Sequence, residues 1–143
     1  MRRVVLALFA LCLCPLAGAQ VSAFADVKAG KGVQLSAQEL RELIPGAKVV
    51  SRTQAGSTRR WQNKPDGTLI ATSDGRGVSG GRNAYSTAEG TWQVTDTGRW
   101  CVKIDWPRAQ DDACRFMFKL GDKYYGVGKL SDEAPTSEYE LSK

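Results

Sequence analysis

The chain has 143 residues, of which 42% are hydrophobic and 24% charged, and it contains no histidine. This size predicts one compact domain, and the lack of histidine excludes Ser-His-Asp and Cys-His catalytic systems, metal and haem sites that need a histidine ligand, and imidazole pH switches. The formal net charge of +5 is small, so we expect no nucleic-acid partner.

The N-terminus has the three parts of a secretory signal peptide. Two arginines are followed by an apolar run over residues 4–16 and by small residues at 17–19. We expect residues 1–19 to be removed by cleavage after Ala19, with residues 23–25 as a second cleavage position. A spanning helix needs about 20 apolar residues, so no transmembrane segment is expected after cleavage. The sequence therefore predicts a periplasmic or secreted protein.

Cleavage would leave two cysteines, Cys101 and Cys114. In an oxidising compartment such a pair predicts one disulfide bond. Closing a loop of about 14 residues contributes about 3 kcal/mol to stability on the chain-entropy model. We expect a structural role, because redox-active pairs typically have CxxC spacing.

A short helix is predicted at the start of the ordered domain, which we expect to span residues 35–130. Residues 20–34 before it are small, polar and aperiodic, which predicts a flexible N-terminal segment. Ser36 and Glu39 form an S-x-x-E capping box, apolar residues follow at helical spacing, and a proline-glycine pair at 45–46 ends the helix. So short a helix must pack its apolar stripe against the rest of the domain.

Short segments rich in β-branched and aromatic residues, separated by turn sequences, follow the helix. Seven are expected to be strands: residues 47–53, 57–63, 68–73, 91–96, 99–106, 114–120 and 123–129. Tight turns between them predict a mainly β fold, in which an antiparallel meander curls into a small barrel or half-barrel with the N-terminal helix packed on it. Residues 131–143 are expected to form an acidic tail or an edge strand.

Alternation along the strands assigns one face to the core. The even-numbered residues of 100–106 are apolar and belong to the core face, which places Cys101 on the opposite face. In the next strand, the apolar residues of 116–120 share the parity of Cys114, so a simple register does not satisfy both the disulfide and the apolar pattern. Either a bulge near residues 107–113 shifts the register, or both faces of this hairpin are covered, one of them by the helix.

A long glycine-rich connection spans residues 74–90 and contains G-x-G-x-x-G at 75–80. The motif lacks the strand–loop–helix context of a dinucleotide site, so we expect no such cofactor. Loops of this length are usually either binding loops or disordered, and both alternatives remain open.

Basic residues are concentrated in the middle of the chain, where residues 48–82 hold seven basic and two acidic side chains. This predicts either an anion-binding face or pairing with the acidic end of the chain. Arginine beside tryptophan can hold carboxylates, phosphates or sugar rings, and alternation sends Arg59 and Arg60 to opposite faces while Trp61 is expected in the core. The candidate ligand-binding residues are Arg52, Arg59, Arg60, Arg76, Arg82 and Tyr125.

Several segments together are similar to a known family. They are SAQELRELIPG at 36–46, PDGT at 65–68, GTWQV at 90–94, RWCV at 99–102, the cysteine at 114 and GDKYY at 121–125. Their order resembles a proteobacterial family of small exported proteins classed only as a domain of unknown function, over roughly residues 35–129. The resemblance implies the architecture and the compartment, and it brings no established catalytic residues.

These features predict a noncatalytic binding protein that takes an anionic small molecule, a glycan or an envelope protein. We expect no cofactor, no metal ion and no enzyme activity, and a monomer or weak oligomer. One alternative is a protein inhibitor or immunity-type partner, which would show a contiguous exposed patch. Another is a histidine-independent hydrolase, which would need a Ser-Lys pair or two converging carboxylates, and the adjacent Asp111 and Asp112 are expected to be solvated in a turn.

Overall fold

The computed structural model describes residues 20–53, 56–75 and 86–143. The predicted signal peptide and most of the glycine-rich connection therefore lie outside the described residues. The helices and strands in chain order are α1 (Phe24–Ala29), β1 (Val33–Gln34), α2 (Ala37–Leu43), β2 (Lys48–Arg52), β3 (Thr58–Gln62), β4 (Thr68–Ser73), β5 (Ser86–Val94), β6 (Trp100–Trp106), β7 (Ala109–Leu120), β8 (Lys123–Val127) and β9 (Thr136–Ser142).

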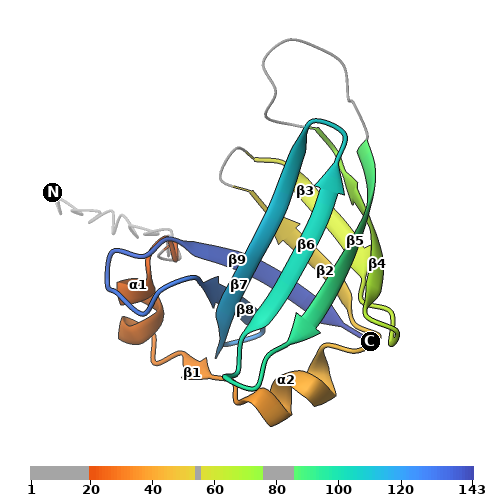
Figure 1. The fold of residues 1–143 in the computed structure, drawn as a ribbon. Helices are drawn as coiled ribbons and strands as arrows, with labels where there is room; N and C mark the ends of the chain where they lie inside the picture. Colours follow the sequence, from red (N-terminus) through yellow and green to blue (C-terminus); the bar gives the residue numbers. More distant parts are fainter. Residues whose placement is uncertain (1–19, 54–55, 76–85) are drawn as a thin grey trace, which may run out of the picture.

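Strands β2 to β9 form an antiparallel meander that closes into an eight-stranded barrel (Figure 1). Each strand pairs with the next one along the chain, and β9 pairs back with β2. The predicted fold class is confirmed, with one barrel strand more than expected. The prediction of a tail or edge strand for residues 131–143 is wrong, because β9 is paired on both sides and its alternate residues Tyr139 and Leu141 turn into the barrel.

The inside of the barrel is the main hydrophobic core, and α2 covers its lower end (Figure 1). Trp100 and Ile104 are 2% exposed, which confirms that the tryptophan face of β6 points inward. The predicted capping box of α2 is present, since Ser36 Oγ accepts a hydrogen bond from the Glu39 N–H at 3.2 Å and the Glu39 carboxylate accepts one from the Ser36 N–H at 2.7 Å. Leu40 on α2 is fully buried against the barrel core, so the helix closes this end.

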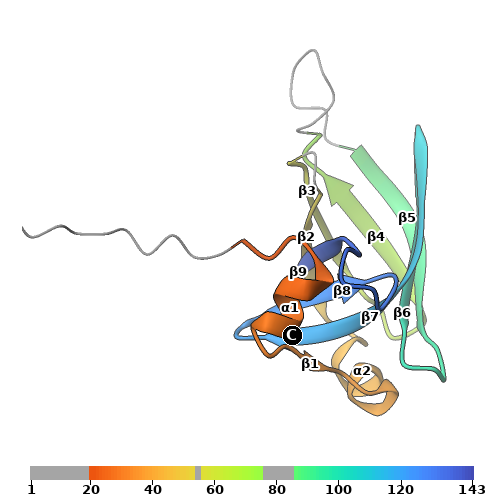
Figure 2. The same cartoon turned by 90° about the vertical axis from the view of Figure 1, so that its left-hand side faces the viewer.

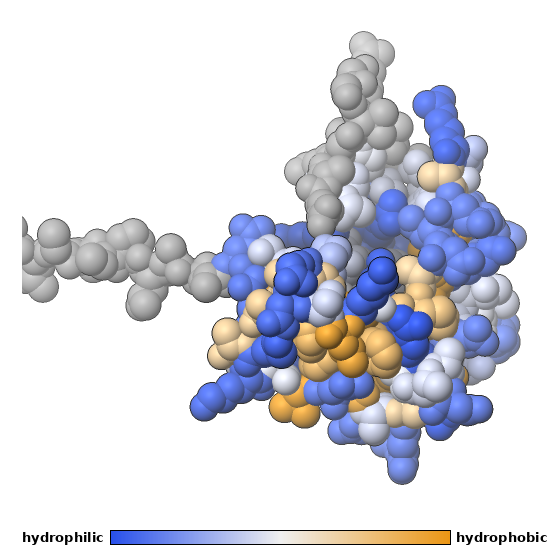
Figure 3. All heavy atoms as spheres, turned by 60° about the vertical axis from the view of Figure 1, so that its left-hand side comes forward, coloured by the Kyte–Doolittle hydropathy of each residue, from blue (hydrophilic) through white to orange (hydrophobic). Residues whose placement is uncertain are grey.

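A second apolar cluster lies outside the barrel, where α1 packs on β7 and β8 (Figure 2). The Phe24 ring centre lies 5.0 Å from that of Phe118, and Val27 is fully buried. Figure 3 shows apolar side chains gathered among hydrophilic ones on the face that carries α1. The prediction that residues 20–34 form a flexible segment is therefore wrong, because this segment contains a helix that covers the outer face of the sheet.

The hairpin of β6 and β7 resolves the conflict between the disulfide and the apolar pattern. Cys101 and Cys114 are directly opposite each other and form the predicted disulfide bond. The register of β6 and β7 is regular from the pair Trp106–Ala109 to the pair Trp100–Arg115, so there is no bulge near residues 107–113. Residues 109–113, expected in the connection, belong to β7. The alternative of two covered faces holds only for the end of β7, where α1 rather than α2 covers Phe118 on the outer face, while Lys103 and Asp105 on the outer face of β6 are exposed.

Strand β7 leaves one side of the barrel wall open. Its second half, from Phe116 to Leu120, pairs with β8, whereas residues 109–115 pair only with β6. In Figure 2, β7 curves away from β8 and its upper half rises apart from β2 and β3. Among the described strands none pairs with the other edge of residues 109–115, and this edge borders the cavity described next.

Candidate functional site

The upper half of the barrel contains a half-open cavity of about 560 Å³. Its walls come from β2, β3, β6, β7 and β9, and they combine the apolar side chains of Trp61, Val102 and Ile104 with hydroxyl and charged groups. Cavities of about 300–1,000 Å³ that mix apolar walls with a few polar groups are typical of small-molecule sites. An eight-stranded barrel has room either for packed side chains or for one such ligand.

A charged pair inside the cavity joins β3 to β7. The guanidinium of Arg59 forms an ion pair with Asp111, and Trp106 Nε1 donates a hydrogen bond of 2.7 Å to the same carboxylate. The Arg59 guanidinium also lies 5.2 Å from the centre of the Trp106 ring. These contacts neutralise Asp111 and hold both side chains in one arrangement.

Arg115 is the second cation on the inner wall, and its side chain has no ion pair or hydrogen bond with another described residue, although its backbone pairs with β6. It lies over Gly126, where a Cβ atom would come within 2.6 Å of Arg115 Cδ and 2.9 Å of the Tyr139 ring. The missing side chain at Gly126 thus makes room for the arginine stem. Because Asp111 already neutralises Arg59, Arg115 gives the cavity an excess positive charge.

Two aromatic rings, Trp61 and Tyr139, line the floor of the cavity, and Trp100 packs against both. The Trp100 ring centre lies 5.3 Å from Tyr139 and 6.2 Å from Trp61, and all three rings are at most 8% exposed. Burial raises the pKa of the Tyr139 hydroxyl above its usual value, and the nearby Arg115 opposes this shift. Tyr139 is therefore a neutral hydroxyl at physiological pH, beside a charged guanidinium.

The structure brings together some of the candidate residues from the sequence and separates others. Arg59 lies in the cavity, and Arg52 lies exposed at its rim. Arg60 points to solvent from the outer face of β3, as alternation predicted. Tyr125 is buried in the outer cluster under α1, away from the cavity, and burial raises the pKa of its hydroxyl. Arg76 and Arg82 lie outside the described residues.

Asp111 and Arg115 are the inward-facing charged residues of the cavity that the sequence analysis did not assign to a binding site. Asp111 was assigned to a solvated turn, but it lies on β7 with Asp112 on the opposite face, so the two carboxylates do not converge. The available signal was parity, since odd-numbered residues of β7 must point inward once Cys114 is on the outer face. In the described part of the chain, no three His, Cys, Asp or Glu side chains lie close enough to hold a metal ion.

Comparison with known proteins gives one match. A family model described as "Protein of unknown function (DUF995)" matches residues 16–117, from before α1 to three residues short of the end of β7. No curated protein and no solved structure matches the chain. Neither of the helices in the described residues is long and apolar enough to span a lipid bilayer.

Proposed function

The chain belongs to the DUF995 family, whose description assigns no activity, and we propose that it is an exported, noncatalytic protein that binds a small anionic molecule in the barrel cavity. The observation that supports this most is Arg115, a cation without an ionic partner among the described residues, on the wall of a cavity of about 560 Å³. A carboxylate or phosphate group would accept hydrogen bonds from its guanidinium in bidentate geometry.

The rest of the cavity suits the apolar body of such a ligand. Trp61, Val102 and Ile104 offer aromatic and aliphatic surface beside Arg115, and the neutral Tyr139 hydroxyl can hydrogen-bond to the anionic group. The site thus combines an anion-binding end with an apolar wall. We propose that it takes a monoanion with an aliphatic or aromatic tail.

Replacing Arg115 with glutamine is expected to weaken binding of such an anion by about 10- to 100-fold, because a hydrogen bond to a charged group contributes about 1.5–3 kcal/mol. The probes are linear monocarboxylates from hexanoate to tetradecanoate, indole-3-acetate and inorganic phosphate, with the matching alcohols as uncharged counterparts. Binding is measured by tryptophan fluorescence, to which Trp61 in the cavity wall contributes, and by thermal shift.

The matched control is Arg60→Gln, which removes the same charge from the exposed outer face of β3. The Arg60→Gln variant should bind the anions as tightly as the wild type does. In the wild type and in this variant, each alcohol should bind more weakly than the matching acid. The proposal fails if no acid in the panel binds, or if the Arg60 and Arg115 variants lose affinity equally.

Export to an oxidising compartment is part of the proposal. The Cys101–Cys114 disulfide supports it, because such bonds persist in oxidising compartments. We expect protein recovered from cells to begin at Gln20 and to contain no free thiol. Cleavage within residues 23–25 would instead remove Phe24, whose ring is 7% exposed and packs on Phe118. Intact-mass measurement with and without a thiol-alkylating reagent checks both statements, and an uncleaved chain with free thiols would contradict them.

A further inference from the structure

The unpaired edge of β7 offers backbone hydrogen-bonding groups to a partner. The Leu35 N–H donates to the Met117 carbonyl at 2.8 Å, which shows that the backbone groups of Met117 face the side of β7 where β1 lies. Backbone groups alternate in direction along a strand, and β7 has a regular register, so the groups of Gln110, Asp112 and Cys114 face the opposite side. Below them this side is occupied by β8, but beside residues 109–115 it has no strand among those described.

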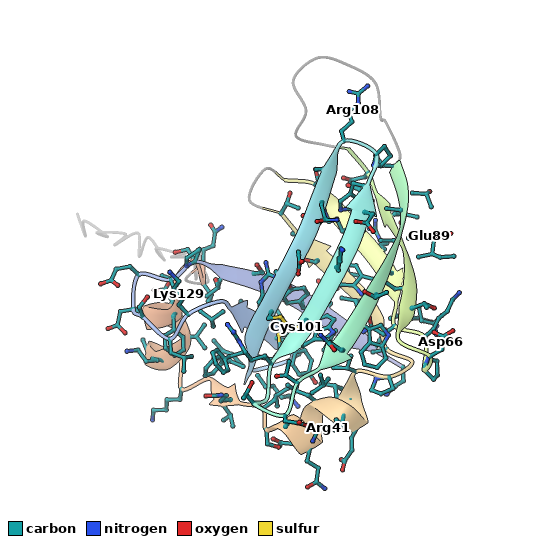
Figure 4. All side chains as sticks on the ribbon, viewed as in Figure 1. Arg41, Asp66, Glu89, Cys101, Arg108 and Lys129 are labelled. Atoms are coloured by element: carbon teal, nitrogen blue, oxygen red, sulfur yellow. A yellow bond between two sulfur atoms is a disulfide. The ribbon has the colours of Figure 1, made fainter. Side chains whose placement is uncertain are left out.

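Two hollows flank this free edge, one inside the barrel and one outside. The inner hollow is the cavity of about 560 Å³, and the outer hollow, of about 750 Å³, lies between β7 and the connection from β8 to β9. Both are lined by Arg52 and Thr53 on one side and by residues 112, 113 and 115 on the other, with Ser137 between them. Lys129, which is labelled in Figure 4, belongs to the outer hollow. The free edge therefore runs along the opening that connects the two hollows.

We propose that this edge accepts an extended peptide of another protein, which adds to β7 as a strand at residues 109–115. Backbone hydrogen bonds to Gln110, Asp112 and Cys114 would provide affinity, as in other cases of strand addition to a free sheet edge. Successive side chains of a strand point to opposite faces. The side chains of the added peptide would therefore enter the inner and outer hollows alternately, which is the geometry that gives such a site its sequence preference.

Charge indicates that the inward-pointing side chain of the peptide is acidic. The inner hollow is lined by three arginines, Arg52, Arg59 and Arg115, and by two aspartates, Asp111 and Asp112, so its charge is positive by one. Arg59 is paired with Asp111, and the Arg115 side chain has no ionic partner among the described residues. The segments of this chain that the structure does not describe have the wrong charge to fill it, since residues 1–19 and 76–85 contain arginines and no acidic residue.

A second copy of the chain fits the edge poorly. Antiparallel pairing of two β7 edges centred on Asp112 would place the two Asp112 carboxylates directly opposite each other. Like charges at directly opposite positions destabilise a strand pair. An acidic peptide from another protein is therefore the occupant to which the proposal commits.

The experiment is a selection from a display library of random nine-residue peptides on the mature, disulfide-bonded protein, followed by amide hydrogen exchange of the complex by NMR. We expect enriched peptides to alternate apolar and polar residues with an acidic residue on one face. On binding, amide exchange at Gln110, Asp112 and Cys114 should slow by a factor of about ten or more. Exchange at Ala113 and Arg115, whose amides face β6, should not change.

The matched variants are Asp112→Pro and Asp112→Ala. Proline removes the N–H that faces the free edge without removing a hydrogen bond to β6, whereas alanine removes only the exposed carboxylate. We expect about tenfold weaker peptide binding by the proline variant and undiminished binding by the alanine variant. If the proline variant does not fold, N-methylation of alternate residues in the peptide tests the same hydrogen bonds on the wild-type protein.

The proposal is overturned if no peptide is enriched, or if enriched peptides leave the amides of Gln110, Asp112 and Cys114 unprotected. It is independent of the small-anion proposal, because a carboxylate bound at Arg115 does not protect the amides that face the free edge of β7. The two proposals therefore fail on different measurements.

Discussion

Replacing both Cys101 and Cys114 with alanine is expected to lower the free energy of unfolding by about 3 kcal/mol, and the melting temperature by about 10 °C. The two cysteines are 13 positions apart and directly opposite each other on β6 and β7. The bond restricts the unfolded chain across this hairpin, and its removal frees the half of β7 that has a strand on one side only. Guanidinium unfolding curves of the oxidised wild type and the double variant measure the loss.

Reduction of the wild type provides the control for this substitution. It should lower stability by nearly the same amount as the double substitution, and the reducing agent should leave the variant unchanged. A loss below about 1 kcal/mol in the double variant would mean that the hairpin pairing alone holds β7 in place.

The second large effect is expected for Leu40→Ala on α2, at about 3 kcal/mol. Leu40 is fully buried where the helix closes the lower end of the barrel, and a buried leucine replaced by alanine typically costs about 2–5 kcal/mol through lost burial and the cavity left behind. The matched control is Glu42→Ala, an exposed position on the same helix, where a change within about 0.5 kcal/mol is expected. Chemical unfolding monitored by circular dichroism compares the two variants.

An equal, small effect of both α2 substitutions would show that the helix does not contribute to the core. If α2 closes the barrel as described, Leu40→Ala should also change the fluorescence of the native protein, because Leu40 belongs to the same apolar cluster as Trp61 and Trp100. Glu42→Ala should leave this fluorescence as it is in the wild type.

Local signals in the sequence were sufficient to predict most of the barrel. The tryptophans of β6, the capping box at Ser36 and the turn sequences each depend on neighbouring residues only, and each has the predicted structure. The disulfide followed from the count of cysteines. These features determine a meander, in which each barrel strand pairs with the next one along the chain, and only the pairing of β9 with β2 joins distant segments.

The cavity itself could not be predicted from an apolar pattern, because its walls are partly polar. Inward-facing Asp111 interrupts the alternation of β7, so that residues 107–113 resemble a loop. In the same way, α1 is a helix of six residues with only Phe24 and Val27 buried, too few for a recognisable period. The part of the barrel that lines the cavity is thus the part in which the sequence pattern is weakest.

The strand that closes the barrel, β9, could have been predicted from the sequence. Residues 137–141 alternate between small or apolar residues that face inward and glutamates that face outward, which is the pattern of a strand with one buried face. Its acidic composition suggested a tail instead. Alternation would have been the better guide, because outward-facing positions on a barrel are free to carry charge.

The pairing of β9 with β2 has a consequence for the order in which the protein folds. These neighbours come from nearly opposite ends of the folded chain, with Lys48 opposite Ser142. A nascent chain without β9 lacks the strand that pairs with β2 and closes the barrel. Contacts between residues so distant in sequence also make folding slow. The barrel therefore cannot close before residues 136–142 have been synthesised, and this delay in folding would favour the export that we propose.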